Sequence, residues 1–329
     1  MNQSTVQTSS GMPLRIGVLG AGGQLGTCLA RVIDASACVE SAFATTRTDL
    51  DLTDLGELDA WLDENAQGSL DAVINAAAHT RVDACESEVD LAYQVNAHAP
   101  GIWARILAER GVRFLHVSTD YVFAGDENRP YREEDPTDPK TVYGASKRAG
   151  EVAVLEVNPA SLIVRTSWVF GPGRNFVGAI LQQAAKRRRR EVDGPLRVVD
   201  DQLGSPTSAA DLATALVRIC IGENPAHRDA SGFLHLRNAG ETTWYGFARE
   251  ILARSGYDDI PLEPVATSAY ETKAPRPAYS VLDCARASQM GLALRPWVEA
   301  LAGYLSGADG SQREQLENTR NWPAHEVQR

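Results

Sequence analysis

Short apolar runs alternate with longer amphipathic segments through the first half of the chain. Residues 15–19, 72–75, 114–118 and 161–165 form runs that are apolar on both faces, and residues 41–45 form a weaker run of the same kind. Between them, residues 24–33, 55–65, 92–110 and 143–157 carry apolar side chains at helical spacing. Buried strands that alternate with helices predict an α/β fold with a parallel sheet covered by helices on both faces.

The pattern changes after Trp168. A loop is predicted at 171–175 and a helix at 176–190, followed by helices and short strands to about residue 305. We therefore expect a Rossmann-like doubly wound sheet with a smaller C-terminal α/β substrate domain. The expected division is a disordered tail (1–12), a dinucleotide-binding domain (13–171, with 196–232 returning to it), a substrate domain (172–195 and 233–306) and a polar tail (307–329).

Composition narrows the class of protein. The chain has 329 residues, 43% of them hydrophobic, and a net charge of −11, which disfavours nucleic acid as a partner. The basic run at 186–190 is interpreted as a solvated helix C-terminus. No apolar run reaches the roughly 18 residues of a membrane span, and the polar first ten residues do not resemble a signal peptide. Five scattered cysteines exclude a disulfide framework. We expect a cytoplasmic protein.

The first apolar run leads directly into a glycine-rich turn. Gly20, Gly23 and Gly26 form G-x-x-G-x-x-G at the start of a helix. Glycine lets the backbone approach a pyrophosphate, and the helix N-terminus offers free N–H groups and partial positive charge. Because the motif lies within a β-α-β pattern, it predicts dinucleotide binding rather than only a tight strand-to-helix turn.

The end of the second strand decides which dinucleotide is preferred. An acidic residue there bonds the 2′-hydroxyl of NAD, whereas an arginine suits the 2′-phosphate of NADP. The sequence has Arg47 among threonines and no carboxylate before Asp49. This favours NADPH, with NADH as the alternative if Arg47 is only a solvated loop residue. Asp51 and Leu52, after an expected short third strand, are placed to meet the adenine.

Tyr143 and Lys147 form Y-x-x-x-K at the start of a predicted helix. This spacing puts both side chains on one face, where an ammonium is expected to lower the phenol pKa and prepare it for proton transfer. Thr119 lies at the C-terminal end of a sheet strand, the edge at which such folds bind ligands. Thr119 and Tyr143 together are suited to hold a carbonyl oxygen that accepts a hydride.

These features resemble the extended short-chain dehydrogenase/reductase superfamily, and within it the dTDP-4-dehydrorhamnose reductase family. The similarity covers residues 13–305. It is carried by the runs N-A-A-A-H-T-R-V-D (75–83), S-T-D-Y-V-F (118–123), V-Y-G-A-S-K (142–147), R-T-S-W-V-F (165–170), D-D-Q-L-G-S-P-T (200–207) and R-P (276–277).

The resemblance implies a role for each matching residue. Tyr143 is the proton donor, Lys147 its activator and a ribose ligand, and Thr119 the third polar partner. The residues implied to bind the cofactor phosphates are Gly23, Gln24 and Leu25, and those implied to line the nicotinamide are Ala78, His79 and Thr80. We expect the backbone of His79 to matter more than its ring. Asp120 and Tyr121 are implied to touch the sugar. Trp168 is implied to form an apolar wall against the sugar, with a core position as the alternative, and Arg276 is a weaker candidate for the diphosphate.

The implied activity is NADPH-dependent reduction of dTDP-4-dehydro-β-L-rhamnose to dTDP-β-L-rhamnose, with hydride delivered to C4, for nucleotide-sugar and cell-envelope polysaccharide biosynthesis. Two alternatives stay open. One is a related nucleotide-sugar reductase or epimerase, and the other is a non-catalytic NADP-binding subunit similar to the regulatory subunit of methionine adenosyltransferase. Either a monomer or a homodimer fits. Some family members bind Mg²⁺ near a dimer interface, but no carboxylate cluster here matches such a site, so no metal ligand is assigned.

Overall fold

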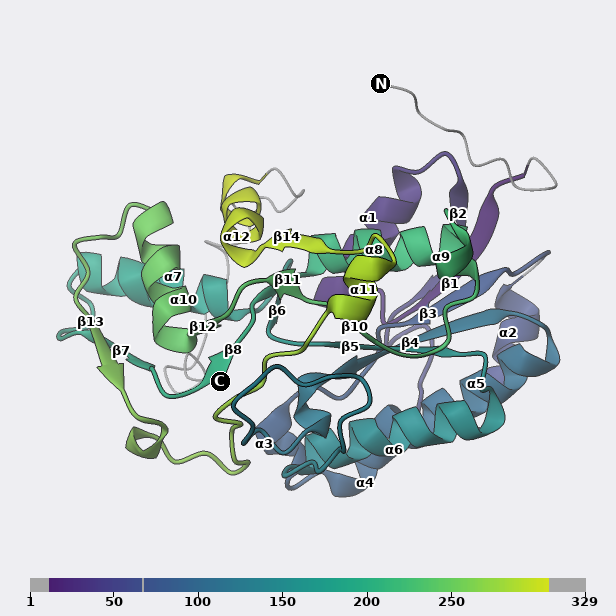
Figure 1. Cartoon of the computed structure of the whole chain (residues 1–329), viewed down its shortest axis with the longest axis horizontal. Coiled ribbons are helices and arrows are strands. Elements are labelled where there is room, and N and C mark those ends of the chain that lie inside the picture. Colours follow the sequence, from purple (N-terminus) through teal and green to yellow (C-terminus); the bar gives the residue numbers. More distant parts are fainter. Residues whose placement is uncertain (1–11, 67, 308–329) are drawn as a thin grey trace.

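A six-stranded parallel sheet forms the centre of the computed structural model, which describes residues 12–66 and 68–307. The strand order is β2-β1-β3-β4-β5-β10, and the order reverses between β1 and β3 (Figure 1). Their bounds are β1 Leu14–Leu19, β2 Val39–Thr45, β3 Ala72–Asn75, β4 Arg113–Thr119, β5 Leu162–Thr166 and β10 Gly232–His235. Ligands in open α/β sheets bind at such a reversal, beyond the carboxyl ends of the strands.

Helices cover both faces of this sheet. On one face α1 (Gln24–Asp34) and α8 (Ala209–Ile221) pack against Ile16, Val18 and Leu115. On the other, α2 (Leu58–Asn65), α5 (Ala99–Glu109) and α6 (Val142–Val157) pack against side chains that include Phe114 and Ile163. Successive residues of β4 thus enter opposite cores, as the two-residue period of a strand requires. The predicted doubly wound parallel α/β fold is confirmed.

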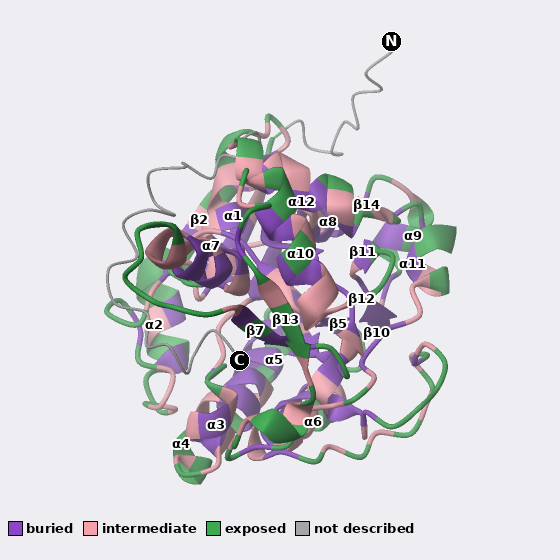
Figure 2. Cartoon of the chain, turned by 90° about the vertical axis from the view of Figure 1, so that its left-hand side faces the viewer, coloured by how far each residue is buried: buried purple, intermediate pink, exposed green. Residues whose placement is uncertain are grey.

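A second hydrophobic core lies beside the sheet. It is formed by α7 (Phe176–Arg188), α10 (Trp244–Arg254), α12 (Trp297–Ser306) and a parallel pair of strands, β7 (Leu196–Val199) with β13 (Leu262–Val265). These elements lie to the left in Figure 1 and face the viewer in Figure 2, where buried residues line their inner sides. Its aliphatic side chains pack around a cluster of aromatic rings, among them Phe170, Phe247 and Trp297.

Segments of the C-terminal half are shared between the two cores. Within the expected return segment 196–232, α8 and α9 (Pro225–Arg228) lie on the main sheet, whereas β7 belongs to the second core because it pairs with β13. Strand β10 also joins the main sheet, beside β5, although nearly all of it falls in the segment expected in the substrate domain. Ala287 on α11 (Ala285–Gln289) also packs against the sheet core. The division into two domains stays a prediction, and the tails expected at 1–12 and 307–329 lie almost wholly outside the described residues.

The shorter elements connect these layers. They are α3 Val82–Cys85, α4 Val89–Tyr93, the π-helix η1 Gln94–His98, the 3₁₀ turns η2 Asp120–Val122 and η3 Thr267–Ala269, and the strands β6 Val169–Phe170, β8 Leu203–Gly204, β9 Thr207–Ser208, β11 Asn238–Ala239, β12 Thr242–Thr243 and β14 Leu294–Pro296. In the described ranges, no helix combines the length and the apolar character that crossing a membrane demands.

Two sequence-based expectations were wrong in detail. The long helix expected at 92–110 is interrupted by the π-helix η1, in which Asn96 is turned inward to bond the backbone of His79. No short third strand precedes Asp51. The carboxylate of Asp49 instead accepts bonds from the backbone N–H and the hydroxyl of Thr46, which closes a turn there.

Candidate active site

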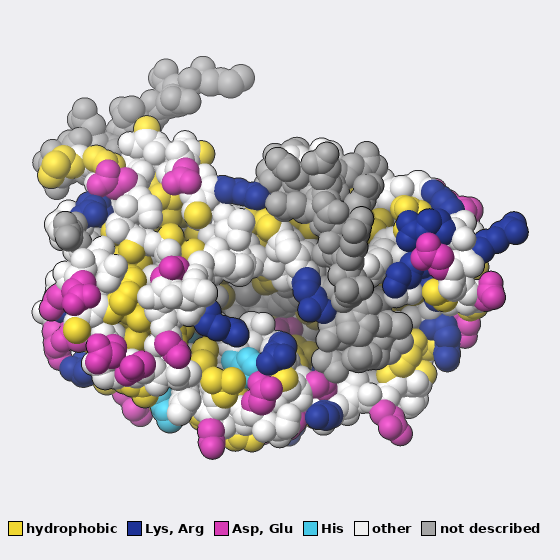
Figure 3. Space-filling model, turned by 180° about the vertical axis from the view of Figure 1, so that it is seen from behind, with side chains coloured by type: hydrophobic (Ala, Val, Ile, Leu, Met, Phe, Trp, Pro, Cys, Tyr) yellow, Lys and Arg dark blue, Asp and Glu magenta, His cyan; other side chains and the backbone are white. Residues whose placement is uncertain are grey.

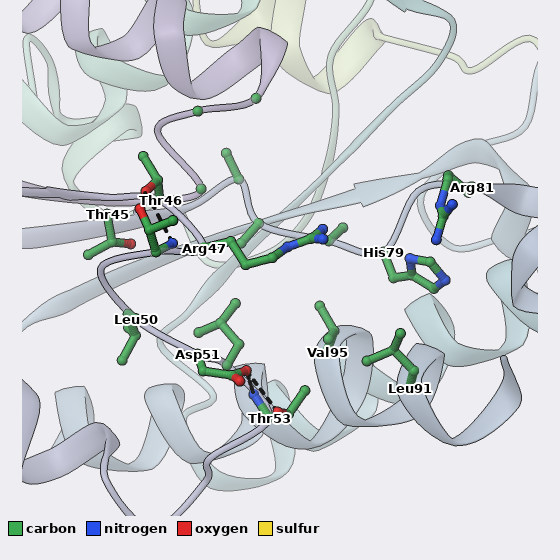
Figure 4. Close-up of a pocket in the computed structure, with 18 residues that line it drawn as sticks. Thr45, Thr46, Arg47, Leu50, Asp51, Thr53, His79, Arg81, Leu91 and Val95 are labelled. Carbon is green, nitrogen blue, oxygen red and sulfur yellow. Dashed lines mark hydrogen bonds between the residues drawn. The ribbon is translucent and has the colours of Figure 1, made fainter.

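A pocket of about 660 Å³ opens beyond the carboxyl ends of β1, β2 and β3, at the reversal of strand order (Figure 4). Its lining includes the glycine-rich turn after β1, the threonine-rich turn after β2 and the loop after β3. Leu91 and Val95 add an apolar wall from α4 and η1. In the view from behind, the surface is hollowed near its middle, and Lys, Arg and His side chains gather around the hollow (Figure 3). Its size and basic lining suit a phosphate-bearing ligand.

Each of the three glycines of the motif has a different physical role in the turn. At Gly20, φ is +83°, and a Cβ would lie 2.7 Å from the backbone of Ala77. At Gly26, a Cβ would lie 2.1 Å from the carbonyl oxygen of Gly20, so this position lets helix α1 pack against the turn. Gly23 lines the pocket and caps α1 with no side-chain bond to its N–H groups, and the first turn of α1 has no acidic residue. The free N-terminus of α1 thus fits a pyrophosphate.

The pocket contains only part of the predicted cofactor-binding set. Gly20, Gly23, Arg47, Asp51, Leu52, Ala78 and His79 line it. Gly26 and Leu25 pack inside, and the Gln24 side chain donates to the carbonyl oxygen of Arg174 at 3.1 Å. Thr80 is exposed beside the pocket, and Tyr143 and Lys147 lie outside its lining.

The end of β2 presents a cation and no free carboxylate. Arg47 is exposed and extends across the pocket toward His79 (Figure 4). Bonds from Thr46 lower the pKa of Asp49 and hold it in the turn, and bonds from Thr53 do the same for Asp51. Sequence reasoning missed Arg81, a second cation in the lining. The sequence feature that could have identified Arg81 is its position in the loop directly after β3.

His79 is held at both its backbone and its ring. Its N–H donates to Asn96 Oδ1 at 2.8 Å, and Asn96 Nδ2 donates to its carbonyl at 3.1 Å. The imidazole Nε2 lies 2.8 Å from Glu88 Oε2. The loop beside the expected nicotinamide position is therefore fixed by the inward amide of the π-helix.

Thr119, at the end of β4, lies beside the start of α6. Its hydroxyl donates to Asp120 Oδ1 at 2.9 Å and accepts from the backbone N–H of Tyr121 at 3.2 Å. Thr141 caps α6 by accepting from the N–H of Gly144 at 3.0 Å, which places Tyr143 in the first turn. The rings of Tyr121 and Tyr143 meet edge to face with centroids 5.6 Å apart. The sequence-predicted hydroxyl and phenol are brought together.

The expectation that Lys147 lowers the phenol pKa was wrong. Burial raises the pKa of Tyr143, whose phenol lies within hydrogen-bond reach of Thr119. The amine of Lys147 points to the sheet instead: Nζ donates to the carbonyl oxygen of Val117 at 2.7 Å and lies 3.2 Å from His116 Nε2. Burial lowers the pKa of Lys147 to about 8.

Asp120 is the carboxylate nearest to this pair. It is buried, and burial raises its pKa to about 6, against the hydrogen bond from Thr119 that favours the ionised form. A carboxyl group that titrates near neutral pH therefore lies in direct contact with the Thr119 hydroxyl.

The two remaining predicted substrate residues have structural partners. Arg276 is buried, donates to Asp83 Oδ2 at 2.5 Å and also bonds the carbonyl of Ala274, but it lines a small pocket together with Tyr121. Trp168 is half-buried with φ +45° and stacks on Trp244 with ring centroids 3.6 Å apart. The edge of its indole ring lies so close to Gly204 that a Cβ there would clash at 2.3 Å.

The family model described as the RmlD substrate binding domain matches residues 14–309. The chain belongs to this family. It is 42% identical to the dTDP-4-dehydrorhamnose reductase of Streptomyces griseus over 292 residues, covering 86% of this chain and 90% of that one.

Two solved members have the same fold. The dTDP-4-dehydrorhamnose reductase of Clostridium acetobutylicum superposes with a TM-score of 0.81 at 35% identity, covering 89% of this chain and 99% of that one. The Bacillus anthracis reductase, solved in complex with NADP, has a TM-score of 0.78 at 32% identity and covers 88% and 97%. The predicted resemblance to this family is confirmed. Across the described residues, no three His, Cys, Asp or Glu side chains converge as a metal site.

Proposed function

We propose that this protein is an NADPH-dependent reductase that converts dTDP-4-dehydro-β-L-rhamnose to dTDP-β-L-rhamnose. The observation that carries the proposal is the meeting of Thr119 and Tyr143 at the carboxyl edge of the sheet, beside a pocket whose glycine turn fits a pyrophosphate. The names of the relatives supply the substrate and the cofactor. A dTDP-sugar is thus the proposed small-molecule partner. We also propose that the protein acts in the cytoplasm, as a monomer or a homodimer.

Different residues of the chain would bind different parts of the dinucleotide. The N-terminus of α1 after Gly23 would hold the pyrophosphate, and Arg47 would bond the 2′-phosphate. Ala78 and the fixed backbone of His79 would line the nicotinamide, and Lys147 would bond the adjoining ribose after turning away from the sheet. NADPH, when bound, supplies the hydride for the C4 carbonyl carbon of the sugar.

Tyr143 would donate its phenolic proton to the C4 oxygen. A phenol with a raised pKa is protonated at neutral pH, so it can act as an acid in the direction of reduction. Thr119 lies beside the phenol at the end of β4 and would act on the C4 oxygen through Tyr143. Since its own proton is donated to Asp120, its hydroxyl oxygen is left to accept from Tyr143, which orients the phenol. Asp120 and Tyr121 would contact the sugar, with Trp168 as the proposed apolar wall and Arg276 as the proposed diphosphate ligand.

The test is turnover by the purified full-length protein with NADPH and the enzymatically prepared 4-keto sugar nucleotide. We expect one NADPH oxidised per dTDP-rhamnose formed. Tyr257→Phe, in the second core, serves as a matched control because it removes a phenolic oxygen far from Thr119 and should retain full activity. Sugar interconversion without net NADPH oxidation would indicate an epimerase. NADPH binding without any turnover would indicate a binding subunit, and either result would overturn the proposal.

A further inference from the structure

Three buried side chains join strands β3 and β4 to helix α6. Asn75 Nδ2 lies 3.1 Å from His116 Nδ1, and His116 Nε2 lies 3.2 Å from Lys147 Nζ. Their exposed fractions are 1%, 0% and 2%. Water is therefore not available to satisfy these polar atoms, and the directions of their hydrogen bonds have to agree with one another.

A backbone amide fixes the direction at one end of this chain of contacts. The N–H of Ala77 donates to Asn75 Oδ1 at 3.0 Å, and a backbone N–H can only donate. The atom of Asn75 that faces His116 is therefore the NH₂ group, which is a donor. It follows that His116 Nδ1 accepts, so the proton of the neutral imidazole is on Nε2.

The same reasoning reaches the lysine. His116 presents an N–H toward Lys147 Nζ, and an ammonium group has no lone pair with which to accept it. A neutral amine has one, and it can still donate to the carbonyl oxygen of Val117 at 2.7 Å. A charged imidazolium is disfavoured as well, because burial holds the pKa of His116 below its ordinary range. All of the bonds are satisfied when Lys147 is neutral.

Other charged groups near Lys147 do not replace this arrangement. Glu151 lies one turn further along α6, but Arg165 bonds both of its oxygens at 2.8 Å and Ser118 donates to it at 2.7 Å. Arg148 reaches the same carboxylate at 3.3 Å. The Glu151 carboxylate is thus paired with Arg165 and Arg148. Burial is the main cause that lowers the pKa of Lys147 to about 8.

We propose that Asn75 and His116 are positioning residues that favour the neutral amine of Lys147 before the dinucleotide binds, so that Lys147 takes up a proton when the dinucleotide binds at alkaline pH. This inference rests on the proposed function, because it requires Lys147 to leave His116 for the cofactor ribose. As an ammonium exposed to the ribose hydroxyls, Lys147 would return toward its ordinary pKa of about 10.4. Proton uptake is therefore expected in the pH window between about 8 and 10.4.

The test is titration calorimetry of the full-length protein with NADPH in buffers of different ionisation enthalpy, which counts the protons exchanged. We expect uptake near one proton per dinucleotide at about pH 9 and near zero at about pH 6.5, where Lys147 is already charged. The 2′-phosphate, with a pKa of about 6, is fully ionised at the higher pH. Lys147→Met should abolish the uptake and thereby assign it to this residue.

Two variants test the positioning pair. Asn75→Asp replaces the donor with an acceptor and should reverse the His116 tautomer, while His116→Phe removes the ring N–H. Each should reduce the uptake at pH about 9 by at least half. His227, another fully buried histidine, is bonded to the carbonyl of Met290 far from the site, so His227→Phe is the matched control and should leave the uptake unchanged.

The outcomes separate this inference from the function it rests on. NADPH binding by the wild type with no proton uptake at about pH 9 would overturn the inference and leave the reductase proposal standing. Proton uptake that persists in both Asn75→Asp and His116→Phe would show that burial alone sets the protonation state of Lys147, and would overturn the role of the pair. Failure of the wild type to bind NADPH would overturn both proposals. The wild-type measurement decides even if a variant fails to fold.

Discussion

The Thr119 hydroxyl donates to the Asp120 carboxylate across 2.9 Å, and the two residues lie at the turn between β4 and η2. A hydroxyl has a single proton, so this bond determines that Thr119 acts as an acceptor toward Tyr143. The orientation of the catalytic phenol therefore depends on the ionisation of a neighbouring carboxyl group.

This dependence predicts an acid limb in the pH profile. The pKa of Asp120 is raised to about 6, so below that pH the carboxyl is protonated and no longer requires the Thr119 proton. We expect kcat/KM of the wild type to fall about tenfold per pH unit below pH 6. Asp120→Asn keeps an amide oxygen as acceptor but does not titrate, so its profile should lack this limb.

A stability measurement checks the same carboxyl group. Its folded pKa lies above the unfolded value of about 3.9, so the native state binds the proton more tightly and loses stability as pH rises through about 4 to 6. The free energy of unfolding of Asp120→Asn should lack this decline. Matching slopes in the two proteins would show that Asp120 is not the titrating group.

Tyr143→Phe removes only the phenolic oxygen. We expect kcat to fall by at least about two orders of magnitude, the scale for losing a general acid, while NADPH affinity is retained. Steady-state kinetics and a fluorescence titration with NADPH measure the two quantities. A variant with more than half of the wild-type activity would mean that another group donates the proton.

Arg47→Ala should discriminate between the two dinucleotides. Arg47 follows β2 and extends across the pocket, where only NADPH brings a 2′-phosphate. Loss of a charge-assisted bond is worth about 1.5–3 kcal/mol, so kcat/KM with NADPH should fall about 10–100-fold, against little change with NADH. Arg81→Ala, in the same pocket after β3, should affect both cofactors alike. Equal responses to Arg47→Ala would remove this residue as the discriminator.

Trp168→Ala distinguishes a sugar wall from a core position. The indole is half-buried and stacks on Trp244, so one face is already covered. If the indole is a wall of the sugar site, its truncation to alanine should raise KM for the keto-sugar about tenfold and lower the melting temperature by a few degrees at most. Trp244→Ala, which removes the other half of the stack, is the control. A normal KM with an unfolding loss of about 3–5 kcal/mol would show that Trp168 is core.

Asp83→Ala should destabilise the fold strongly. It leaves the buried guanidinium of Arg276 without its charged partner, which is expected to lower the free energy of unfolding by about 3–5 kcal/mol. Glu109→Ala breaks the exposed Arg105–Glu109 pair and should change the free energy of unfolding by less than about 1 kcal/mol. Urea denaturation measures both. Similar small losses would mean that Arg276 is free to serve the substrate.

The sheet was predictable because its strands are buried on both faces and are bounded by turn residues. The run 72–75 coincides with β3, and the glycine turn after β1 has the form that a pyrophosphate requires. Thr119 and Tyr143 were found together because both lie at predicted ends of elements on one edge of the sheet.

The contacts that the sequence does not reveal depend on tertiary packing. The spacing of Tyr143 and Lys147 places them on one helix face, but it does not show that His116 and a strand carbonyl bond the amine. The pairing of Arg276 with Asp83 spans 193 residues and follows no local pattern. In the π-helix, Asn96 bonds the His79 backbone, a contact that periodicity does not encode.

Isotope transfer tests the central claim most directly. The full-length protein is supplied with NADPH that carries deuterium at the transferable position of nicotinamide C4, together with dTDP-4-dehydro-β-L-rhamnose. The account predicts dTDP-rhamnose with one deuterium at sugar C4 for each NADPH oxidised. A product without deuterium at C4, or no product while NADPH remains unoxidised, would contradict it.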